Sequence, residues 1–179
     1  MKVTLKAVRL SFPTLFTAKG FNGGEDNKKF GATFILDKEE HADLIKQVEQ
    51  VIAKVKKEKW GKDASKVKKT FLTDGEEKEE FDGYDDTVMA ISSSTSKRPP
   101  VVDRKLVPLA EEDDTIYAGC IVNATIDVWA QDNQFGKRVN AQLRAVQFWE
   151  HGEAFGADPV SAEDEFEAAD DDDMGGLEG

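Results

Sequence analysis

The chain has 179 residues, of which 34% are charged, and its formal net charge is −12 at pH 7. This length suits one domain with a buried core and an appendage, and it leaves no room for a second full domain. The single cysteine, Cys120, excludes an internal disulfide, and no apolar run approaches the about 18 residues of a membrane span. We therefore expect a cytoplasmic protein that is neither secreted nor inserted in a membrane.

The first two predicted elements are β-strands. Apolar and polar residues alternate over residues 2–7, which predicts a strand with Ala7 on its apolar face. Pro13 lacks an amide donor, so the strand is expected to end near it. Residues 20–29 are rich in Gly and Asn and predict a loop, and a second alternating stretch over residues 29–36 predicts the next strand.

A single amphipathic helix is expected to follow. Asp37 can cap its start, apolar residues recur at helical spacing over residues 44–55, and Gly61 offers a stop. Trp60, at the end of this helix, has two readings. Anchoring of the helix terminus is favoured over stacking on a ligand.

Less regular sequence precedes the last two strands. Residues 87–91 predict a short strand, and residues 92–100 combine a serine run with two prolines, which predicts irregular structure. This segment is either a linker or a mobile basic loop on a binding face, and the sequence favours neither. An edge strand is expected around residues 101–102.

Two long alternating stretches, residues 115–130 and 137–149, predict a β-hairpin. Trp129 lies on the face of the first strand that otherwise carries polar residues. If residues 132–135 form the hairpin loop, Trp129 pairs with Arg138. The expected architecture is mainly β, with five or more antiparallel strands and one helix.

No pattern of catalytic or metal-binding residues is present. The two histidines, His41 and His151, are isolated from each other and from Cys120, so no zinc-ligand spacing exists. The serines of residues 92–96 have no neighbouring histidine, and the acidic residues 74–86 do not follow the spacing of a calcium loop. We expect no enzyme activity, no metal and no cofactor.

The charges are segregated along the chain. Residues 150–179 hold 12 acidic residues and no Lys or Arg, which leaves 24 acidic and 24 basic residues in residues 1–149. Within that neutral body, residues 54–69 carry eight lysines and residues 74–86 carry eight acids. Basic segments can converge into a groove, although each one also matches an ordinary solvated surface.

Basic loops and an aromatic ring on a polar face favour binding of single-stranded nucleic acid. Lys and Arg neutralise the backbone, and exposed rings stack on bases of any identity. A protein that recognises double-stranded DNA would more usually carry a recognition helix rich in Arg, Asn and Gln. We predict stacking by Trp129 and Phe135, and backbone contacts from Lys28, Lys29, Lys97, Arg98, Arg104, Lys137, Arg138 and Arg144.

Four stretches stand out: "RLSFPTLF", "KKFGATFIL", "KRPPVVD" and, most specific, "VWAQDNQFGKRVNAQL". They resemble a phage and prophage family to which single-stranded DNA-binding proteins of tailed phages belong. The resemblance implies an OB-fold, here a partly open antiparallel barrel, followed by an acidic C-terminal tail. It also implies a protein that coats single strands during phage DNA replication, recombination or repair.

Two parts are expected: an OB-fold DNA-binding domain over residues 1–151 and a disordered acidic tail over residues 152–179. The tail has few large apolar residues and many like charges, so it cannot fold alone. We expect it to compete with DNA for the groove of its own molecule and to recruit phage or host replication and recombination proteins. The sequence also permits a homo-oligomer. The predicted partner-binding residues are Phe166, Asp170, Asp171, Asp172 and Asp173.

Two other functions compete with DNA binding. The net charge also suits an acidic protein-interaction module or a DNA mimic, in which the body is only a scaffold. A metal-dependent nuclease is disfavoured, because the acidic residues cluster in loops and tail instead of on strands beside a lysine.

Overall fold

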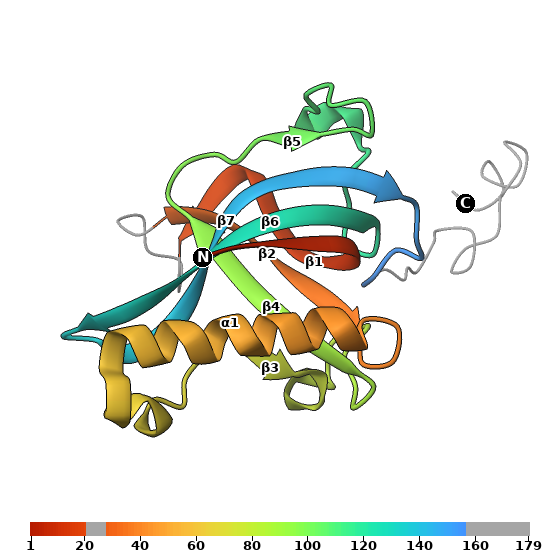
Figure 1. Ribbon diagram of the computed structural model, residues 1–179. Coiled ribbons are helices and arrows are strands. Elements are labelled where there is room, and N and C mark those ends of the chain that lie inside the picture. Colours follow the sequence, from red (N-terminus) through yellow and green to blue (C-terminus); the bar gives the residue numbers. More distant parts are fainter. Residues whose placement is uncertain (21–27, 157–179) are drawn as a thin grey trace, which may run out of the picture.

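The structure is a computed structural model that describes residues 1–20 and 28–156. Its centre is a closed barrel in which the strands follow the order β1-β2-β4-β7-β6 and β6 returns to pair with β1 (Figure 1). β3 and β5 add to the sheet outside the barrel. The strands are β1 Lys2–Gly20, β2 Lys28–Asp37, β3 Leu72–Asp74, β4 Val88–Thr95, β5 Val101–Val102, β6 Ile121–Asn133 and β7 Gly136–Glu150.

The predicted fold class is confirmed, with one refinement. The barrel was expected to be partly open, and it is closed by a short parallel pairing of β4 with β7, at Ser94 and Gln142. The other barrel pairings are antiparallel. Within the described residues, the helices are α1 Ala42–Trp60 and three short 3-10 turns, η2 Gly61–Lys66, η3 Gly75–Lys78 and η4 Glu111–Asp113.

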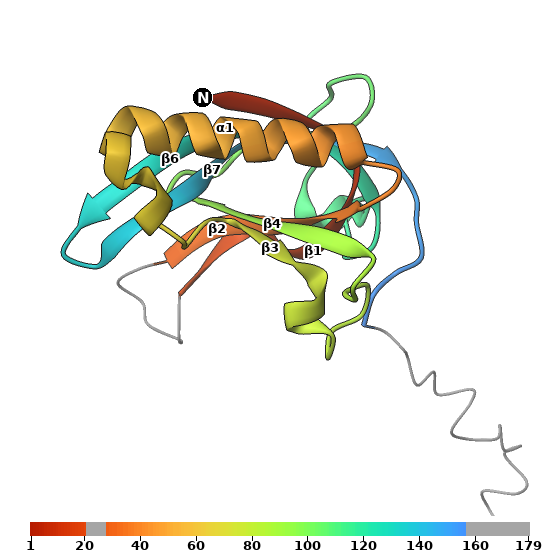
Figure 2. The same cartoon turned by 60° about the horizontal axis from the view of Figure 1, so that its bottom comes forward.

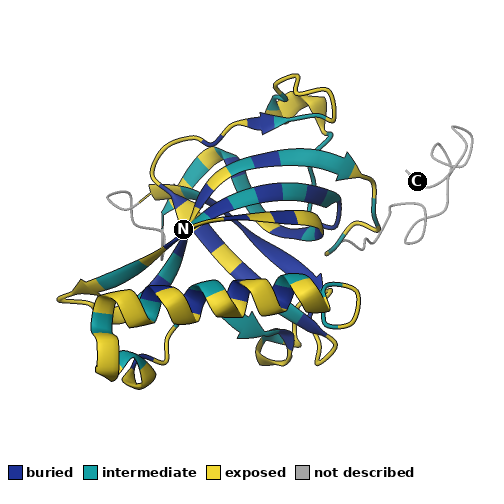
Figure 3. Ribbon diagram, in the orientation of Figure 1, coloured by how far each residue is buried: buried dark blue, intermediate teal, exposed yellow. Residues whose placement is uncertain are grey.

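Helix α1 packs against one end of the barrel, as Figures 1 and 2 show. Its buried residues, Ile45, Val48, Ile52 and Val55, join the inward-facing strand residues in one core. The buried stripe along α1 and the alternation along the strands are visible in Figure 3. None of the helices within the described residues is long and apolar enough to cross a membrane.

The ends of α1 differ in how well the sequence predicts them. Gly61 ends the helix in a positive-φ conformation, at 55°, as expected. The start was expected at Asp37, but that carboxylate accepts bonds from the amides of Glu39 and Glu40, at 2.8 and 2.9 Å. Asp37 therefore caps a preceding turn, and the helix begins at Ala42. His41, which precedes the helix, is hydrogen-bonded through its Nε2 to the Ala7 carbonyl at 3.0 Å.

Strand β1 is longer and more irregular than predicted. Ala7 was expected to face the core, but a register shift between Leu5 and Val8 turns it outward with a φ of 52°. Val8 takes the core position instead. The strand also continues past Pro13 to Gly20. A second register shift, between Ser11 and Thr14, leaves Pro13 at a position where no backbone N–H has to donate a hydrogen bond to β2.

Strand β4 runs through most of the serine-rich segment that was predicted to be irregular. It ends at Thr95, and its small polar side chains alternate between buried and exposed positions. Ser93 is buried, and its hydroxyl donates to the Ala32 carbonyl at 2.8 Å. A serine whose hydroxyl donates to a neighbouring carbonyl can be buried in a strand, so a serine run need not form a loop.

The β6–β7 hairpin has a different register from the predicted one. Asn133 pairs with Gly136, so the turn is shorter than the expected loop over residues 132–135. The Asn133 side chain accepts the Phe135 amide at 2.9 Å, and Gly136 adopts a φ of 112°. Trp129 consequently pairs with Asn140, and the prediction that it faces Arg138 is wrong.

The folded body extends beyond His151, where the domain boundary was predicted. Phe155 packs against the cluster of Ile35, Tyr84, Val88 and Ala90, and its ring centroid lies 4.0 Å from the Arg9 guanidinium. Arg9 also donates to the Glu153 carbonyl at 2.6 Å, and the Gly156 amide donates to Asp82 at 2.8 Å. Residues 152–156 therefore belong to the body and not to the tail.

Candidate nucleic-acid interface

The outer face of β1, β2 and β4 has a covered half and an open half. In the covered half, Ile35 and Ala90 lie opposite each other and pack beneath Tyr84 and Phe155. The adjoining half has no such cover and borders a large groove. The groove side of these strands presents small or hydroxyl-bearing residues, Gly31, Thr33, Ser92 and Ser94.

The groove has a volume of about 1600 Å³ and is strongly basic. Among the described lining residues, the single carboxylate is that of Asp63, and it is paired with Lys66 at 3.3 Å. Such an excess of positive charge in a concave surface attracts polyanions. The lining Lys and Arg residues are Lys19, Lys29, Lys66, Lys68, Lys69, Lys137 and Arg138.

Backbone pairing brings the lysine-rich segment after α1 to the groove. Thr70 forms a parallel bridge with Val139 of β7, and the Val139 amide donates to the Lys69 carbonyl at 3.1 Å. Burial lowers the pKa of Lys56, and the charge of Lys68 lowers it further. The segment is thus fixed against the hairpin, with its charges close together.

Trp60 anchors the end of α1, as favoured from the sequence. Its indole Nε1 donates to the carboxylate of Asp132, at 3.0 Å, near the tip of the β6–β7 hairpin. This bond ties the helix to the hairpin that forms one wall of the groove. Trp60 itself is not among the lining residues.

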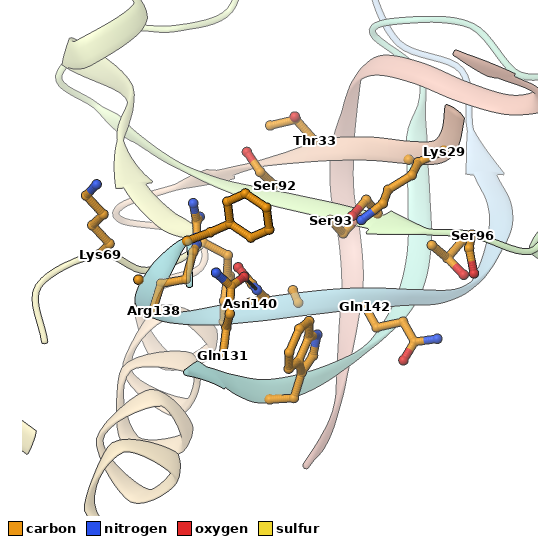
Figure 4. A pocket seen from close by; sticks show the side chains of 18 of the residues that line it. Lys29, Thr33, Lys69, Ser92, Ser93, Ser96, Gln131, Arg138, Asn140 and Gln142 are labelled. Atoms are coloured by element: carbon orange, nitrogen blue, oxygen red, sulfur yellow. Dashed lines mark hydrogen bonds between the residues drawn. The ribbon is translucent and has the colours of Figure 1, made fainter. Parts of the chain in front are cut away.

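The hairpin supplies two exposed aromatic rings to the groove. Trp129 is 45% exposed and Phe135 is 81% exposed, and both line it. Polar side chains from the same strands lie beside them, with Asn140 donating to Gln131 at 2.8 Å. Figure 4 shows Gln131, Asn140 and Gln142 on the hairpin across the groove from β2 and β4. Rings and amides together can receive bases and their polar edges.

Arg138 supplies an unusual donor. Among the buried side-chain nitrogen and oxygen atoms of the described residues, its Nε is the one with no hydrogen-bond partner. Buried donors normally have partners, because leaving one unpaired costs about 1–3 kcal/mol.

The predicted contact residues fall into three groups. Lys29, Trp129, Phe135, Lys137 and Arg138 line the groove, which brings together residues from β2, β6 and β7. Three others stand next to lining residues in the chain. They are Lys28, beside Lys29, and Lys97 and Arg98, which follow Ser96.

Arg104 and Arg144 are not among the lining residues. The Arg104 guanidinium lies 4.1 Å from the Trp149 ring and donates to the Trp149 carbonyl at 2.6 Å. It also pairs with Glu150 at 3.6 Å. Arg104 is therefore engaged in the body, whereas Arg144 is simply exposed on β7.

Several lining residues were missed from the sequence as individual contacts. The density of lysines in residues 54–69 was a visible signal, but only the Thr70–Val139 bridge selects which of them reach the groove. Phe12 gave no signal, because it was placed in an ordinary strand. The missed lining residues of most interest are Phe12, Lys19, Lys66, Lys68 and Lys69.

The described residues give no arrangement for metal or thiol chemistry. Within residues 1–20 and 28–156, no group of three or more His, Cys, Asp or Glu side chains is placed to hold a metal ion. Cys120 is fully buried, and burial raises the pKa of its thiol. The predicted partner-binding residues Phe166, Asp170, Asp171, Asp172 and Asp173 lie outside the described residues.

Comparison with known proteins agrees with the resemblance noted in the sequence. Residues 1–175 match the family described as Enterobacter phage Enc34, ssDNA-binding protein. The chain belongs to this family. A curated relative, the putative protein p50 of Acyrthosiphon pisum secondary endosymbiont phage 1, is 39% identical over 176 residues, with 93% of each chain covered.

Solved structures agree with this assignment. The single-stranded DNA-binding protein from bacteriophage Enc34, in complex with ssDNA, has a TM-score of 0.77 and 30% identity, covering 87% of this chain and 89% of that one. The single-stranded DNA-binding protein gp2.5 of bacteriophage T7 shares the fold alone, with a TM-score of 0.64 and 14% identity over 93% and 95% of the chains. Membership in the Enc34 family agrees with the expectation that the chain is not an enzyme.

Proposed function

We propose that this protein binds single-stranded DNA in the basic groove, without sequence preference, and coats it in the cytoplasm of a phage-infected bacterium. The observation that carries the proposal is the joint presence of seven Lys and Arg side chains and two exposed rings, Trp129 and Phe135, in one groove. The cations neutralise phosphates, and the rings stack on unpaired bases. Similarity to an Enc34 protein solved with ssDNA supports the same ligand.

A gel-shift assay with labelled oligo(dT), a mixed-sequence single strand and a duplex tests this function. We expect the single strands to bind with similar affinity and on the order of ten times or more tightly than the duplex, because stacking needs unpaired bases. No added metal is required. Equal affinity for single strand and duplex would contradict the proposal, and absence of binding to either would favour the alternative of an acidic protein-interaction or DNA-mimic module.

We further propose that the acidic tail competes with DNA for the groove. Residues 152–156, which pack on the body, end at Gly156, whose amide donates to Asp82. Asp82 lies in the same loop as Phe81, and the Phe81 ring packs edge-on against Phe12, a lining residue of the groove. Gly156 is thus linked through this loop to the margin of the groove, and a chain of 23 residues such as 157–179 can span roughly 75 Å when extended, at about 3.3 Å per residue. Tethering gives the tail an effective concentration on the order of millimolar, so even weak attraction competes with phosphate.

Truncation after Gly156 removes residues 157–179, keeps residues 152–156, and so tests whether the tail competes with DNA. We expect the truncated protein to bind oligo(dT) several-fold more tightly than the full chain at low salt, with the gain shrinking as salt rises. Fluorescence anisotropy over a salt series measures both effects. Identical affinities at low ionic strength would mean that the tail does not visit the groove.

DNA that displaces the tail would also free it for other proteins. Phe166 and the run Asp170, Asp171, Asp172 and Asp173 combine a ring with dense negative charge, which suits a basic pocket on a replication, recombination or repair protein. Recruitment would then favour the places where single strands are already coated. A pull-down of the host or phage replication proteins with full-length and truncated chains, with and without oligo(dT), distinguishes tail-dependent recruitment from capture through the body.

A further inference from the structure

A second pair of exposed rings lies at the groove, apart from Trp129 and Phe135. Phe12 of β1 is 49% exposed and Phe81, in the loop after η3, is 43% exposed. Their centroids are 5.1 Å apart and their planes are perpendicular. Phe12 is a lining residue of the groove. Two large apolar rings held together in water at the border of a basic groove require an explanation.

The backbone holds Phe12 out of the sheet. It sits at the register shift between Ser11 and Thr14, directly before Pro13, with a φ of 46°. A positive φ is unfavourable for a bulky residue and costs on the order of 1–3 kcal/mol, and such strained residues cluster at functional sites. Continuing the regular strand would have avoided this conformation. The bulge instead displays the ring.

The ring pair is also supported from beneath. Tyr84 is buried, its ring stacks on Phe12 at a centroid distance of 6.0 Å, and it contacts Phe81 edge-on at 6.4 Å. Its hydroxyl donates to the Ser11 hydroxyl at 2.8 Å. The buried tyrosine fixes the loop and β1 to each other, so the two exposed rings have a rigid base.

The strand order separates the two aromatic pairs. Around the barrel, β1 carries Phe12, followed by β2, β4 and β7, and then β6 with Trp129. Four steps of about 4.8 Å between neighbouring strands give an arc of roughly 19 Å on the groove side. The serines and threonines of β2 and β4 form the floor between the two pairs. The pairs therefore stand at opposite margins of one groove.

We propose that Phe12 and Phe81 form a second stacking platform, which receives a base of the single strand and marks one end of its path across the groove. The proposal rests on the function proposed above and adds the direction of the path, from the hairpin across β7, β4 and β2 to β1. Charge explains why the path ends there. Exposed acids surround Phe81 in the chain, at Glu79, Glu80 and Asp82, and would repel further phosphates.

Oligonucleotide length tests the platform. Anisotropy with oligo(dT) of about 4 to 16 nucleotides covers the range of site sizes of single OB-folds. We expect Phe12→Ala to weaken binding about 5- to 150-fold for strands long enough to reach both margins, and to leave the shortest strands unaffected. The salt dependence should stay that of the wild type, because no charge is lost. Phe81→Ala should have the same pattern with a smaller effect.

Two control variants separate stacking from folding. Phe12→Tyr keeps the ring and should bind every length as the wild type does. Leu106→Ala removes a large side chain that is 69% exposed and does not line the groove, so its affinities should not change. Equal weakening of all lengths by Phe12→Ala would indicate a structural role, and no weakening at any length would also overturn the platform.

Photocrosslinking on the unaltered protein gives an independent answer, including the case in which Phe12→Ala unfolds. Oligo(dT) carrying one 5-iododeoxyuridine at successive positions should crosslink to Phe12 or Phe81 only from positions near one end of the bound stretch, and to Trp129 from the other. Crosslinks to Trp129 without any to Phe12 or Phe81 would refute the platform alone. If the wild-type protein bound no oligo(dT), the proposed function and the platform would both fail.

Discussion

Replacing Lys68, Lys69 and Lys137 together by Ala is expected to lower the affinity for oligo(dT) about 100-fold at 0.1 M salt. The three side chains line the groove and come from two segments that the Thr70–Val139 bridge holds side by side. Each phosphate contact with a single strand contributes about 0.7 to the slope of log K against log salt concentration. Three lost contacts therefore reduce that slope by about 2, and a salt series measures it.

A matched variant controls for total charge. Lys46, Lys54 and Lys57 are exposed on α1 and do not line the groove. Replacing these three by Ala removes the same charge and should change the slope by far less. Equal effects of the two triple variants would mean that DNA responds to the overall charge of the body and that the groove is not the binding site.

The second large effect is expected from Trp129→Ala, which should weaken binding to oligo(dT) by about 1–3 kcal/mol without unfolding the protein. The ring is 45% exposed on the outward face of β6, so its removal leaves no cavity in the core. Trp129→Phe retains a stacking surface and should recover most of the affinity. Anisotropy gives the affinities, and thermal unfolding of each variant verifies the fold.

Intrinsic fluorescence provides a direct readout of the same ring. Stacking of bases on Trp129 should quench the emission of the wild-type protein, and the quenching should be largely absent from Trp129→Phe. Unchanged emission on adding oligo(dT), together with wild-type binding by Trp129→Ala, would assign this residue a structural role.

The sequence predicted the parts of the fold that depend on local patterns. Alternation in β2, β6 and β7 and the helical spacing over residues 44–55 correspond to observed elements. Features that local pattern does not encode were predicted wrongly. The register shifts of β1 move Ala7 outward and let the strand pass Pro13, and they depend on pairing with β6 and β2. The serine run of β4 likewise becomes a strand through its pairing with β2.

The sequence predicted the type of site, a basic groove with exposed rings, but only some of the residues that line it. Trp129, Phe135, Lys137 and Arg138 could be chosen because one hairpin carries them and strand alternation defines its faces. Phe12, Lys68 and Lys69 reach the groove through contacts between segments far apart in the chain, such as the Val139–Lys69 hydrogen bond. Residue spacing along the sequence carries no trace of those contacts.

The short parallel pairing between β4 and β7 gives the barrel an uneven resistance to opening. β6 and β7 pair along nearly their whole lengths, whereas β4 and β7 meet at Ser94 and Gln142 alone. Local unfolding begins where the fewest hydrogen bonds must break, so the barrel would open first between β4 and β7. Both residues line the groove. A DNA strand that contacted both residues would bridge β4 and β7 where they share fewest hydrogen bonds. Binding would then oppose the separation of these strands and make the whole barrel more rigid.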